Sequence, residues 1–379
     1  MSDSVDAIDL LSEPPSGLPE RLVAMAEEVA GAPAALYVVS IGGMHLFRVA
    51  GARALPESVP IISGVGPELG RDGLAELCSE LDRLAPGCIV SPLWLRGRAT
   101  AVLVACRGLE EDLDGLARAA APAVELAAGF TDVFDRARRS QRPTAAAEIQ
   151  QDLLGPRMAV VGGAEIAGSV LPAYDVGGDW FDHSENPECT FVGVADAVGR
   201  GASAAAISVV ALGAIRAARR AAAPLEECCR DADLAINSLG GAAFTTAILA
   251  EWHALTRTFS WINCGHPRPL LLGADGAIEE LVGDGTHPLG VWSGPERRFP
   301  RNERRLEVGD RVLIYTDGVT ERRTDDGGLV GLEGLLEFLA TLRDASAAAT
   351  VVAIESYVRG VGDNKIADDA TQLVMAVTG

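Results

Sequence analysis

Short apolar runs separated by turns dominate the chain beyond Gly155 and Pro156, and this pattern constrains the fold more than any other feature. Such runs are typical of β-strands. They cover residues 165–171, 189–195, 245–252, 258–263, 269–272, 311–315 and 372–377, and helices are predicted at 202–220, 225–239, 332–340 and 347–360. Because the strands cluster around two central helices, the fold class expected here is α+β, with stacked sheets and helices outside them, and not a doubly wound sheet.

The first hundred residues predict a smaller α+β domain. A helix at about 20–29 precedes two apolar runs, 35–41 and 44–49, that flank Gly42 and Gly43 and predict a β-hairpin. A second helix, at about 74–84, precedes another pair of runs at 88–95 and 99–106. At 379 residues the chain exceeds the size of one typical core, so two domains are expected.

A long helical pattern separates these two regions. Between 109 and 139 its apolar residues recur at three- and four-residue spacing: Leu113, Leu116, Ala120, Ala123, Leu126, Ala127, Phe130 and Phe134. Pro143 ends the pattern, and Thr144 can cap a short helix that runs to Leu154. We therefore expect a domain at 1–108, a helical linker at 109–143 and a second domain at 144–379. The apolar positions predict a parallel dimer seam, and the alternative is that they pack on their own domain.

Charge and cysteine content exclude several classes of protein. The formal net charge is −21, with 53 acidic and 32 basic residues, so nucleic acid and anionic membranes are not expected partners. The seven cysteines include no CxxC pair, which indicates thiols in a reducing compartment. Neither a signal sequence nor an apolar run of about 18 residues is present, so a cytoplasmic protein is expected.

Aspartates stand where predicted strands meet glycine-rich turns. They are Asp179 in VGGDWFD, Asp196 in VGVADAVGRG, Asp317 in VLIYTDGVTE, and Asp368 with Asp369 in IADDATQLVM. A single such residue is usually a turn aspartate. Four sites in one domain favour a metal cluster, because carboxylates held at a sheet edge need a compensating cation. Oxygen ligands without His or Cys spacing favour Mg²⁺ or Mn²⁺ over Zn²⁺.

Seven ordered motifs carry a resemblance to a known family. They are VLPAYDVGGDWFD, VADAVGRGASAAA, FTTAILAEW, INCGHPRPLLL, PLGV, VGDRVLIYTDGVTE and DDATQLVMAV. Residues 145–377 thereby resemble PPM/PP2C-type serine/threonine phosphatases of the SpoIIE/RsbU branch, which act in bacterial partner switching. The resemblance implies an α-β-β-α sandwich. Residues 1–108 resemble a GAF-type sensor domain more weakly.

The resemblance also implies roles for individual residues. Asp196 would bridge two divalent ions, with the backbone carbonyl of Ala197 as a further ligand. Asp179 would hold the first ion directly or through a water molecule, and Asp317 and Asp368 would hold the second. Asp369 flanks the same turn as Asp368 and is the alternative ligand there.

Other polar residues near these motifs each have two interpretations. Asp182, in GGDxxD, is expected to orient the turn, with metal binding as its alternative. Arg200 stands where the family usually has a histidine, in Gly199-Arg200-Gly201. Arg157, Arg200 and Lys365 are candidates for phosphate contact, against the simpler interpretation as surface charges. His266, in NCGHP, is expected to be structural, with general acid catalysis as the alternative.

The expected function is metal-dependent hydrolysis of phosphoserine or phosphothreonine. Two ions about 3.5 to 4 Å apart can activate a bridging water, so no covalent nucleophile is needed. The resemblance implies a phosphorylated STAS-type anti-anti-sigma protein as substrate, and a small-molecule or protein signal at the N-terminal domain of a homodimer. Two alternatives stay open: a non-catalytic partner-switch binding module, and a metal-dependent hydrolase of small phosphoesters.

Overall fold

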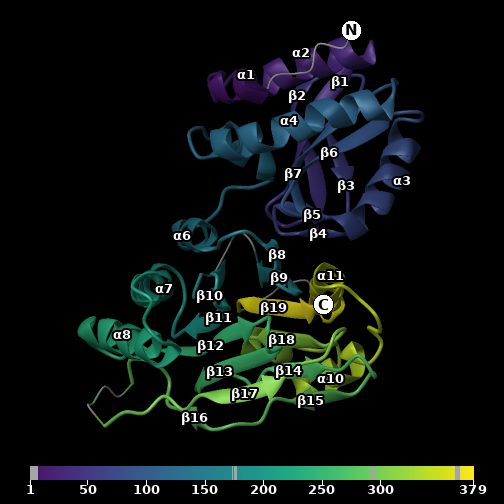
Figure 1. The fold of residues 1–379 in the computed structure, drawn as a ribbon. Coiled ribbons are helices and arrows are strands. Elements are labelled where there is room, and N and C mark those ends of the chain that lie inside the picture. The colour runs from purple at the N-terminus through teal and green to yellow at the C-terminus, as the bar shows by residue number, and fades with distance from the viewer. Residues whose placement is uncertain (1–6, 173, 175–176, 292–293, 295, 363–367) are drawn as a thin grey trace. The chain divides into compact units, whose positions relative to one another are not determined.

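The chain forms two compact units, Met1–Arg142 and Pro143–Gly379. The structure is a computed structural model, and it describes residues 7–172, 174, 177–291, 294, 296–362 and 368–379. Lys365, one of the candidates for phosphate contact, lies outside the described residues. Each unit has its own hydrophobic core. Figure 1 shows the helices and strands of both units.

The first unit is built on one antiparallel sheet with the strand order β3-β2-β1-β7-β5-β4, and β6 pairs with β7. Its strands are β1 (Ala34–Val39), β2 (His45–Gly51), β3 (Ser58–Pro60), β4 (Gly64–Val65), β5 (Glu68–Gly70), β6 (Ile89–Leu95) and β7 (Arg98–Ala105). Its helices are α1 (Ala7–Ser12), α2 (Leu18–Ala30), α3 (Leu74–Leu84), α4 (Glu110–Ala128) and α5 (Val133–Arg138). Both predicted hairpins are present, as β1–β2 and β6–β7.

Helix α4 belongs to the core of this unit. Its Leu113, Leu116 and Val124 are buried in one cluster with Leu22 of α2 and Leu36 of β1. The prediction of a separate linker at 109–143 with a dimer seam is therefore wrong for this helix, and the alternative that it packs on its own domain is confirmed. Its apolar stripe covers the sheet because that surface would otherwise face water. Two residues near its end, Leu126 and Phe130, stay 58% and 81% exposed.

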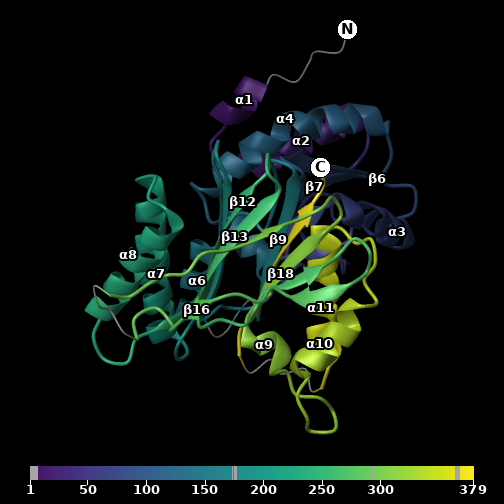
Figure 2. The ribbon, with the colours of Figure 1, turned by 60° about the horizontal axis from the view of Figure 1, so that its bottom comes forward.

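The second unit is a sandwich of two six-stranded sheets (Figure 2). The first has the order β10-β11-β12-β13-β16, with β17 beside β13: β10 (Asp179–Glu185), β11 (Thr190–Ala197), β12 (Thr245–His253), β13 (Thr258–Cys264), β16 (Gly285–Thr286) and β17 (Asn302–Arg305). The second has the order β15-β14-β18-β19-β9-β8: β8 (Met158–Val161), β9 (Ala164–Leu171), β14 (Leu270–Leu272), β15 (Ile278–Glu280), β18 (Arg311–Tyr315) and β19 (Ala370–Val377).

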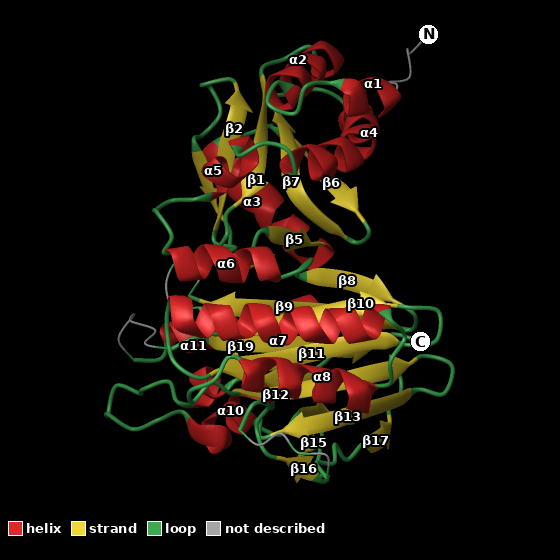
Figure 3. Ribbon diagram, turned by 90° about the vertical axis from the view of Figure 1, so that its left-hand side faces the viewer, coloured by secondary structure: helices red, strands yellow, loops and turns green. Residues whose placement is uncertain are grey.

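Helices cover the outer faces of both sheets. The sheet with β10–β13 is covered by α6 (Ala145–Leu153), α7 (Ala202–Arg220) and α8 (Leu225–Ser238), and Figure 3 shows α7 and α8 side by side across it. On the other sheet, α11 (Ala347–Gly360) packs against β9 and β19. The short α9 (Asp317–Thr320) and α10 (Gly331–Leu339) complete this layer. The predicted α+β sandwich is confirmed.

Close contact between the sheets explains the sequence of the central strands. All eight residues of β19 are buried, because it is covered by a sheet on one face and a helix on the other. Such strands have near-continuous apolar sequences. Gly168 of β9 allows a close approach between the sheets, because a Cβ atom there would lie 2.8 Å from the ring of Phe181 in β10.

Helix α7 is long and apolar enough to cross a membrane by length and composition alone. Its Ala211, Leu212 and Ile215 are buried in the core of the second unit. In its last turns, Arg216 and Arg219 form ion pairs with Asp182 of β10, at 2.9 and 3.1 Å. These contacts are those of a core helix of the sandwich.

Glu355 of α11 is buried against β9 and predicts a pH-dependent stability. The Ser169 hydroxyl donates a hydrogen bond to it, and Arg359 lies 3.5 Å away. Burial raises the pKa of Glu355 from 4.5 to about 7, although Arg359 and Arg157 oppose the shift. Between these pH values the folded state binds more protons than the unfolded state, so the free energy of unfolding falls as pH rises, by about 3 kcal/mol in all.

We expect Glu355→Gln to be more stable than the unchanged protein at pH 8 and to lose that advantage at pH 5. Thermal unfolding across this range measures the difference. Glu337→Gln, at an exposed position of α10, is the matched control. A Glu355→Gln protein whose melting temperature followed the unchanged protein at every pH would contradict the prediction.

Candidate metal centre

Two facing strands supply the first pair of carboxylates. Asp179 is the first residue of β10, and it lies directly opposite Asp196 in the antiparallel ladder with β11. Directly opposed residues have Cβ atoms about 4.5 to 5.5 Å apart, so both side chains reach the same point. The two carboxyl groups are within hydrogen-bonding reach of each other. Asp179 is 2% exposed.

The opposite sheet supplies Asp317, at the start of α9, and the pair Asp368 and Asp369, just before β19. Thr316 links the two sheets, because its Oγ1 donates a hydrogen bond of 2.7 Å to Oδ2 of Asp179 and accepts one of 2.9 Å from the Thr371 amide. The five aspartates that the sequence singled out therefore lie at one edge of the sandwich. This is a set of carboxylate oxygens gathered from segments almost 200 residues apart.

Asp368 and Asp369 have different environments although they are adjacent. Asp369 is buried, and its Oδ2 accepts hydrogen bonds from the amides of Gly177, Gly178 and Asp179, at 3.2, 2.9 and 3.2 Å. It therefore fixes the glycine turn that precedes β10. The side chain of Asp368 is 52% exposed, and its Oδ2 accepts a bond of 3.1 Å from Nη2 of Arg200. The carboxylate of Asp368 is thus the more accessible of the two, whereas the carboxylate of Asp369 is engaged in hydrogen bonds to the turn.

The carboxyl groups raise one another's pKa values. Burial, followed by the charges of Asp317, Asp368 and Asp369, raises the pKa of Asp196 to about 7. Burial with the charges of Asp196 and Asp369 raises the pKa of Asp179 well above its ordinary value. Burial also raises the pKa of Asp317, helped by Glu321 and Asp368.

Burial raises the pKa of Asp369 as well, to about 6, although the amides of Gly178 and Asp179 oppose the shift. Within the described residues, Arg200 is the basic side chain paired with a member of this cluster, and it reaches only Asp368. The site is short of positive charge. Divalent cations with a preference for oxygen ligands, Mg²⁺ or Mn²⁺, fit such a donor set.

Two glycines allow the backbone to close around the carboxylates. A Cβ atom on Gly178 would lie 2.9 Å from the carbonyl oxygen of Ala197, which is the backbone ligand implied by the resemblance. A Cβ atom on Gly318 would lie 1.9 Å from the carbonyl oxygen of Asp369. The second distance is far below any van der Waals contact, so only glycine fits between α9 and the start of β19.

Asp182 does not join the cluster. It lies three residues after Asp179 on β10, which places it on the opposite face of the strand. There it is held by Arg216 and Arg219 of α7. Both earlier interpretations of Asp182, as a ligand or as an acceptor that orients the turn, are therefore wrong, because its partners fasten the strand to the helix.

His266 is buried, and its Nδ1 lies 2.8 Å from Oγ1 of Thr246. Asn263 bonds both the amide and the carbonyl of His266 and so closes the turn. Burial lowers the pKa of His266 to about 3, so the ring is neutral at physiological pH. These contacts favour the structural interpretation over a general acid.

The two described arginines proposed for phosphate contact differ in position. Arg157 is buried, donates a hydrogen bond of 2.6 Å to Gln151 and stacks over the ring of Phe181. Its role is in packing. The side chain of Arg200 is 62% exposed beside Asp368, so of the two arginines it is the one that solvent and solutes can reach at the carboxylate cluster.

Gln150 of α6 is a site residue that the sequence analysis missed. It is 1% exposed, and its Nε2 donates to the backbone carbonyl of Asp179 at 2.9 Å and to Oδ2 of Asp369 at 2.8 Å. The helix therefore touches both sheets of the site through one side chain. The signal available in the sequence was its place on the same face as the buried Ala146 and Ala147.

Comparison with known proteins decides the family. The family described as Stage II sporulation protein E (SpoIIE) matches residues 186–378, slightly more than half of the chain. The chain belongs to the SpoIIE family. The prediction of a PPM/PP2C-type protein phosphatase is thereby confirmed at the level of the family, and the aspartates from Asp196 onward lie inside the matched range.

Three known proteins are similar to parts of this chain. The chain is 24% identical to phosphoserine phosphatase RsbU of Bacillus subtilis (strain 168) over 232 residues, which are 61% of this chain and 68% of RsbU. The SiaA-PP2C domain of Pseudomonas aeruginosa has the same fold, with a TM-score of 0.53, 20% identity and coverage of 61% of this chain and 94% of that one. The crystal structure of the RsbU and RsbW domains of Rv1364c from Mycobacterium tuberculosis shares 27% identity, with a TM-score of 0.49 and coverage of 58% of this chain and 61% of that one.

Proposed function

We propose that this SpoIIE-family chain removes phosphate from phosphoserine or phosphothreonine in a protein, with two Mg²⁺ or Mn²⁺ ions as cofactors. The observation that carries the proposal is the cluster of carboxylates, drawn from two facing sheets, that raise one another's pKa values. Asp179, Asp196, Asp317 and Asp368 would hold the ions, with the carbonyl of Ala197. Bound ions of this kind supply an activated water and stabilise charge on phosphoryl oxygens.

The protein's own residues position this chemistry. Asp369 holds the glycine turn through three backbone amides, and Thr316 fixes the orientation of Asp179 across the two sheets. A metal ion bound by Asp368 would displace Arg200 from that carboxylate. The freed guanidinium would then bind a phosphoryl oxygen. The family's usual histidine at this position is replaced here by a longer cation with a planar set of donors.

The two alternatives, a non-catalytic binding module and a hydrolase of small phosphoesters, each differ from a protein phosphatase in an observable property. A non-catalytic binding module needs no metal ligands, yet every aspartate of the cluster is present, which favours the enzyme. A hydrolase of small phosphoesters would turn over free nucleotides as fast as phosphoproteins. The similarity to RsbU, whose name is phosphoserine phosphatase, supports the phosphoprotein substrate.

For the substrate we infer a phosphorylated STAS-type anti-anti-sigma protein. The test compares phosphate release, with Mn²⁺ present, from such a protein, from unrelated phosphoserine peptides and from free nucleotides. We expect kcat/KM to be at least about tenfold higher on the STAS-type protein, since a docked protein adds binding energy beyond the phosphoserine. Equal rates on all peptides would leave a general phosphatase, and equal rates on nucleotides would favour the small-phosphoester hydrolase.

Helix α6 is the proposed route of regulation, since it is the first element of the second unit and Gln150 bonds to both sheets of the site. We expect Gln150→Ala to lower the rate and to raise the Mn²⁺ concentration needed for half-maximal rate, each by about 10- to 100-fold, as loss of a residue that orients ligands does elsewhere. The measurement is phosphate release over a Mn²⁺ titration.

Gln151→Ala is the matched control, because its side chain bonds Arg157 and not the site. The control is expected to keep the Mn²⁺ dependence of the unchanged protein. If Gln150→Ala also kept the Mn²⁺ dependence of the unchanged protein, the proposal that α6 controls the metal centre would be wrong.

The first unit is proposed to be a GAF-like sensor for a small-molecule or protein signal, in a cytoplasmic homodimer without nucleic acid or membrane partners. The exposed Leu126 and Phe130, near the end of α4, are proposed to form the dimer contact. The test compares the full chain with a fragment that starts at Thr144, by mass in solution and metal-dependent rate. If the full chain and the fragment were both monomers with identical rates, neither the dimer nor regulation by the first unit would stand.

A further inference from the structure

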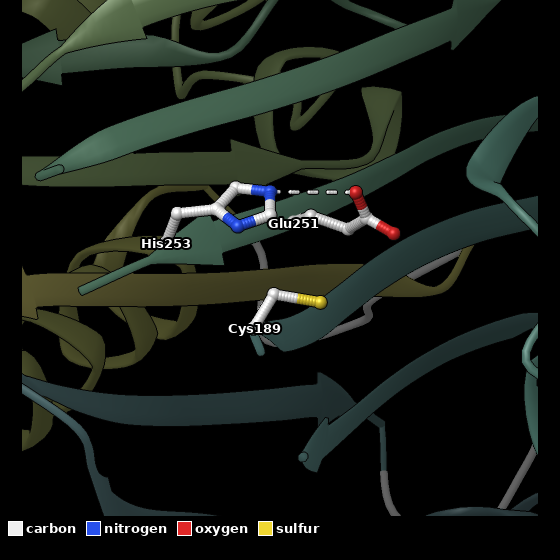
Figure 4. Close-up of side chains that lie close together, drawn as sticks. All are labelled: Cys189, Glu251 and His253. Carbon is white, nitrogen blue, oxygen red and sulfur yellow. Dashed lines mark ion pairs between the residues drawn. The ribbon is translucent and has the colours of Figure 1, made fainter. Parts of the chain in front are cut away.

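A second group of metal-binding side chains lies in the same sandwich, away from the carboxylate cluster. Cys189, Glu251 and His253 offer a thiol, a carboxylate oxygen and an imidazole nitrogen, all within 4.8 Å of one another. Figure 4 shows the three side chains gathered at one place, with the imidazole facing the carboxylate at 3.6 Å. All three are partly exposed, so an ion can reach them.

Strand pairing creates this group. Thr190 lies opposite Trp252 and Phe191 lies opposite Glu251, so Cys189 falls beside His253 at the next step of the β11–β12 ladder. Glu251 and His253 are two residues apart on β12 and therefore share a face. At the other end of the same strand, Thr246 lies opposite Asp196. His253 lies seven positions beyond Thr246, which is about 24 Å along a strand, so the two groups lie at opposite ends of β12.

The guanidinium of Arg301 is a positive charge that contacts both Glu251 and His253. Its Nη2 lies 2.5 Å from Oε2 of Glu251 and 3.4 Å from Nε2 of His253. A guanidinium can donate to Nε2 only when that nitrogen carries a lone pair, which is the form of histidine that binds a metal. In the tautomer whose Nε2 is unprotonated, the carboxylate and the imidazole both direct lone pairs at one cationic centre. Arg301 is a quarter exposed and reaches this centre from a segment before β17, so it can move away.

The donor set selects the ion. In a tetrahedral zinc shell with bonds of about 2.0 to 2.3 Å, neighbouring ligand atoms are about 3.3 to 3.8 Å apart. The separation of 3.6 Å between His253 and Glu251 falls in this range. A thiolate with an imidazole and one carboxylate suits Zn²⁺ and not Mg²⁺ or Mn²⁺, which prefer oxygen alone.

We propose that Cys189, Glu251 and His253 bind one Zn²⁺, with Arg301 displaced and a water molecule as the fourth ligand. The site ties the turn between β10 and β11 to the end of β12. It is independent of the proposed phosphatase centre, both in position and in the chemistry of its ligands.

Cobalt titration of the full chain tests this proposal, with excess Mg²⁺ present to occupy the carboxylate centre. A Co²⁺ ion bound to a cysteine thiolate gives a near-ultraviolet charge-transfer absorption that a carboxylate site cannot give. We expect this absorption to saturate at one Co²⁺ per chain and to disappear when Zn²⁺ is added. It should be absent in Cys189→Ser and unchanged in Cys78→Ser, the control at an exposed cysteine of the first unit.

Two further variants keep the proposal testable if the serine variant folds poorly. His253→Ala should bind Co²⁺ about tenfold more weakly or worse, and Arg301→Gln should bind it more tightly because the competing cation is gone. No charge-transfer absorption in the unchanged protein, or an absorption that survives both Cys189→Ser and His253→Ala, would overturn the zinc site. Weaker binding by Arg301→Gln would overturn the role given to the arginine.

Discussion

Asp196→Asn is expected to reduce phosphate release by about a thousandfold or more while the fold stays intact. Asp196 lies directly opposite Asp179 and is electrostatically coupled to Asp317, Asp368 and Asp369. An amide in this position has the same shape but cannot supply the charge that holds a divalent ion. The measurement is the rate of phosphate release from a phosphoprotein at saturating Mn²⁺.

The same substitution is expected to stabilise the metal-free protein, by about 1 to 3 kcal/mol in the free energy of unfolding at neutral pH. The reason is that it removes one member of a set of like charges that raise one another's pKa values. Thermal unfolding in the presence of a chelator measures this. Asp231→Asn, on the exposed side of α8, is the matched control and should change neither rate nor stability. Full activity of Asp196→Asn with Mn²⁺ would exclude the role of a bridging ligand.

Gly318→Ala is expected to destabilise the second unit by about 3 kcal/mol and to remove most of the activity. The added Cβ atom would lie 1.9 Å from the carbonyl oxygen of Asp369, and both sides of this contact are backbone. Neither side can yield by a side-chain rotation, so α9 must move away from the start of β19, and overpacking of this kind costs about 1 to 3 kcal/mol or more. Asp317 is the first residue of α9 and would move with it.

Gly213→Ala is the control for this substitution, because it makes the same chemical change within α7. A Cβ atom on Gly213 meets nothing within 4 Å, and the position is exposed. Alanine in a helix interior is favoured over glycine by about 1 kcal/mol, so this variant should be slightly more stable and fully active. A Gly318→Ala protein with the melting temperature and rate of Gly213→Ala would contradict the close approach of α9 to Asp369.

Local patterns in the sequence were enough to predict the sandwich and the five aspartates. Strands such as β18 and β19 are near-continuous apolar runs because they are buried on both faces, and Asp196, Asp317 and the pair Asp368 and Asp369 each stand next to an apolar run, whereas Asp179 was identified from its glycine turn. This information is contained within about ten residues. For the same reason Asp182 could have been placed correctly, since an odd spacing from Asp179 on a strand means the opposite face.

Partners far apart in the sequence could not be predicted in the same way. The apolar spacing of α4 shows that one face is buried, but not whether the first unit's own sheet or a second chain buries it. Gln150 and Asp369 are 219 residues apart, and only the packing of α6 against the site brings them together. The pairing of Cys189 with His253 needed the register of β11 and β12, which no local signal gives.

Metal dependence is the most direct test of the account, because every role proposed for the carboxylate cluster requires bound ions. Mn²⁺ binding to the full chain, counted by calorimetry at neutral pH, is compared with phosphate release from a phosphoserine protein in the same titration. We predict two Mn²⁺ ions per chain, a rate that rises as they bind, and complete loss of both signals with a chelator. Phosphate release that continues unchanged after all divalent ions are removed would contradict the account.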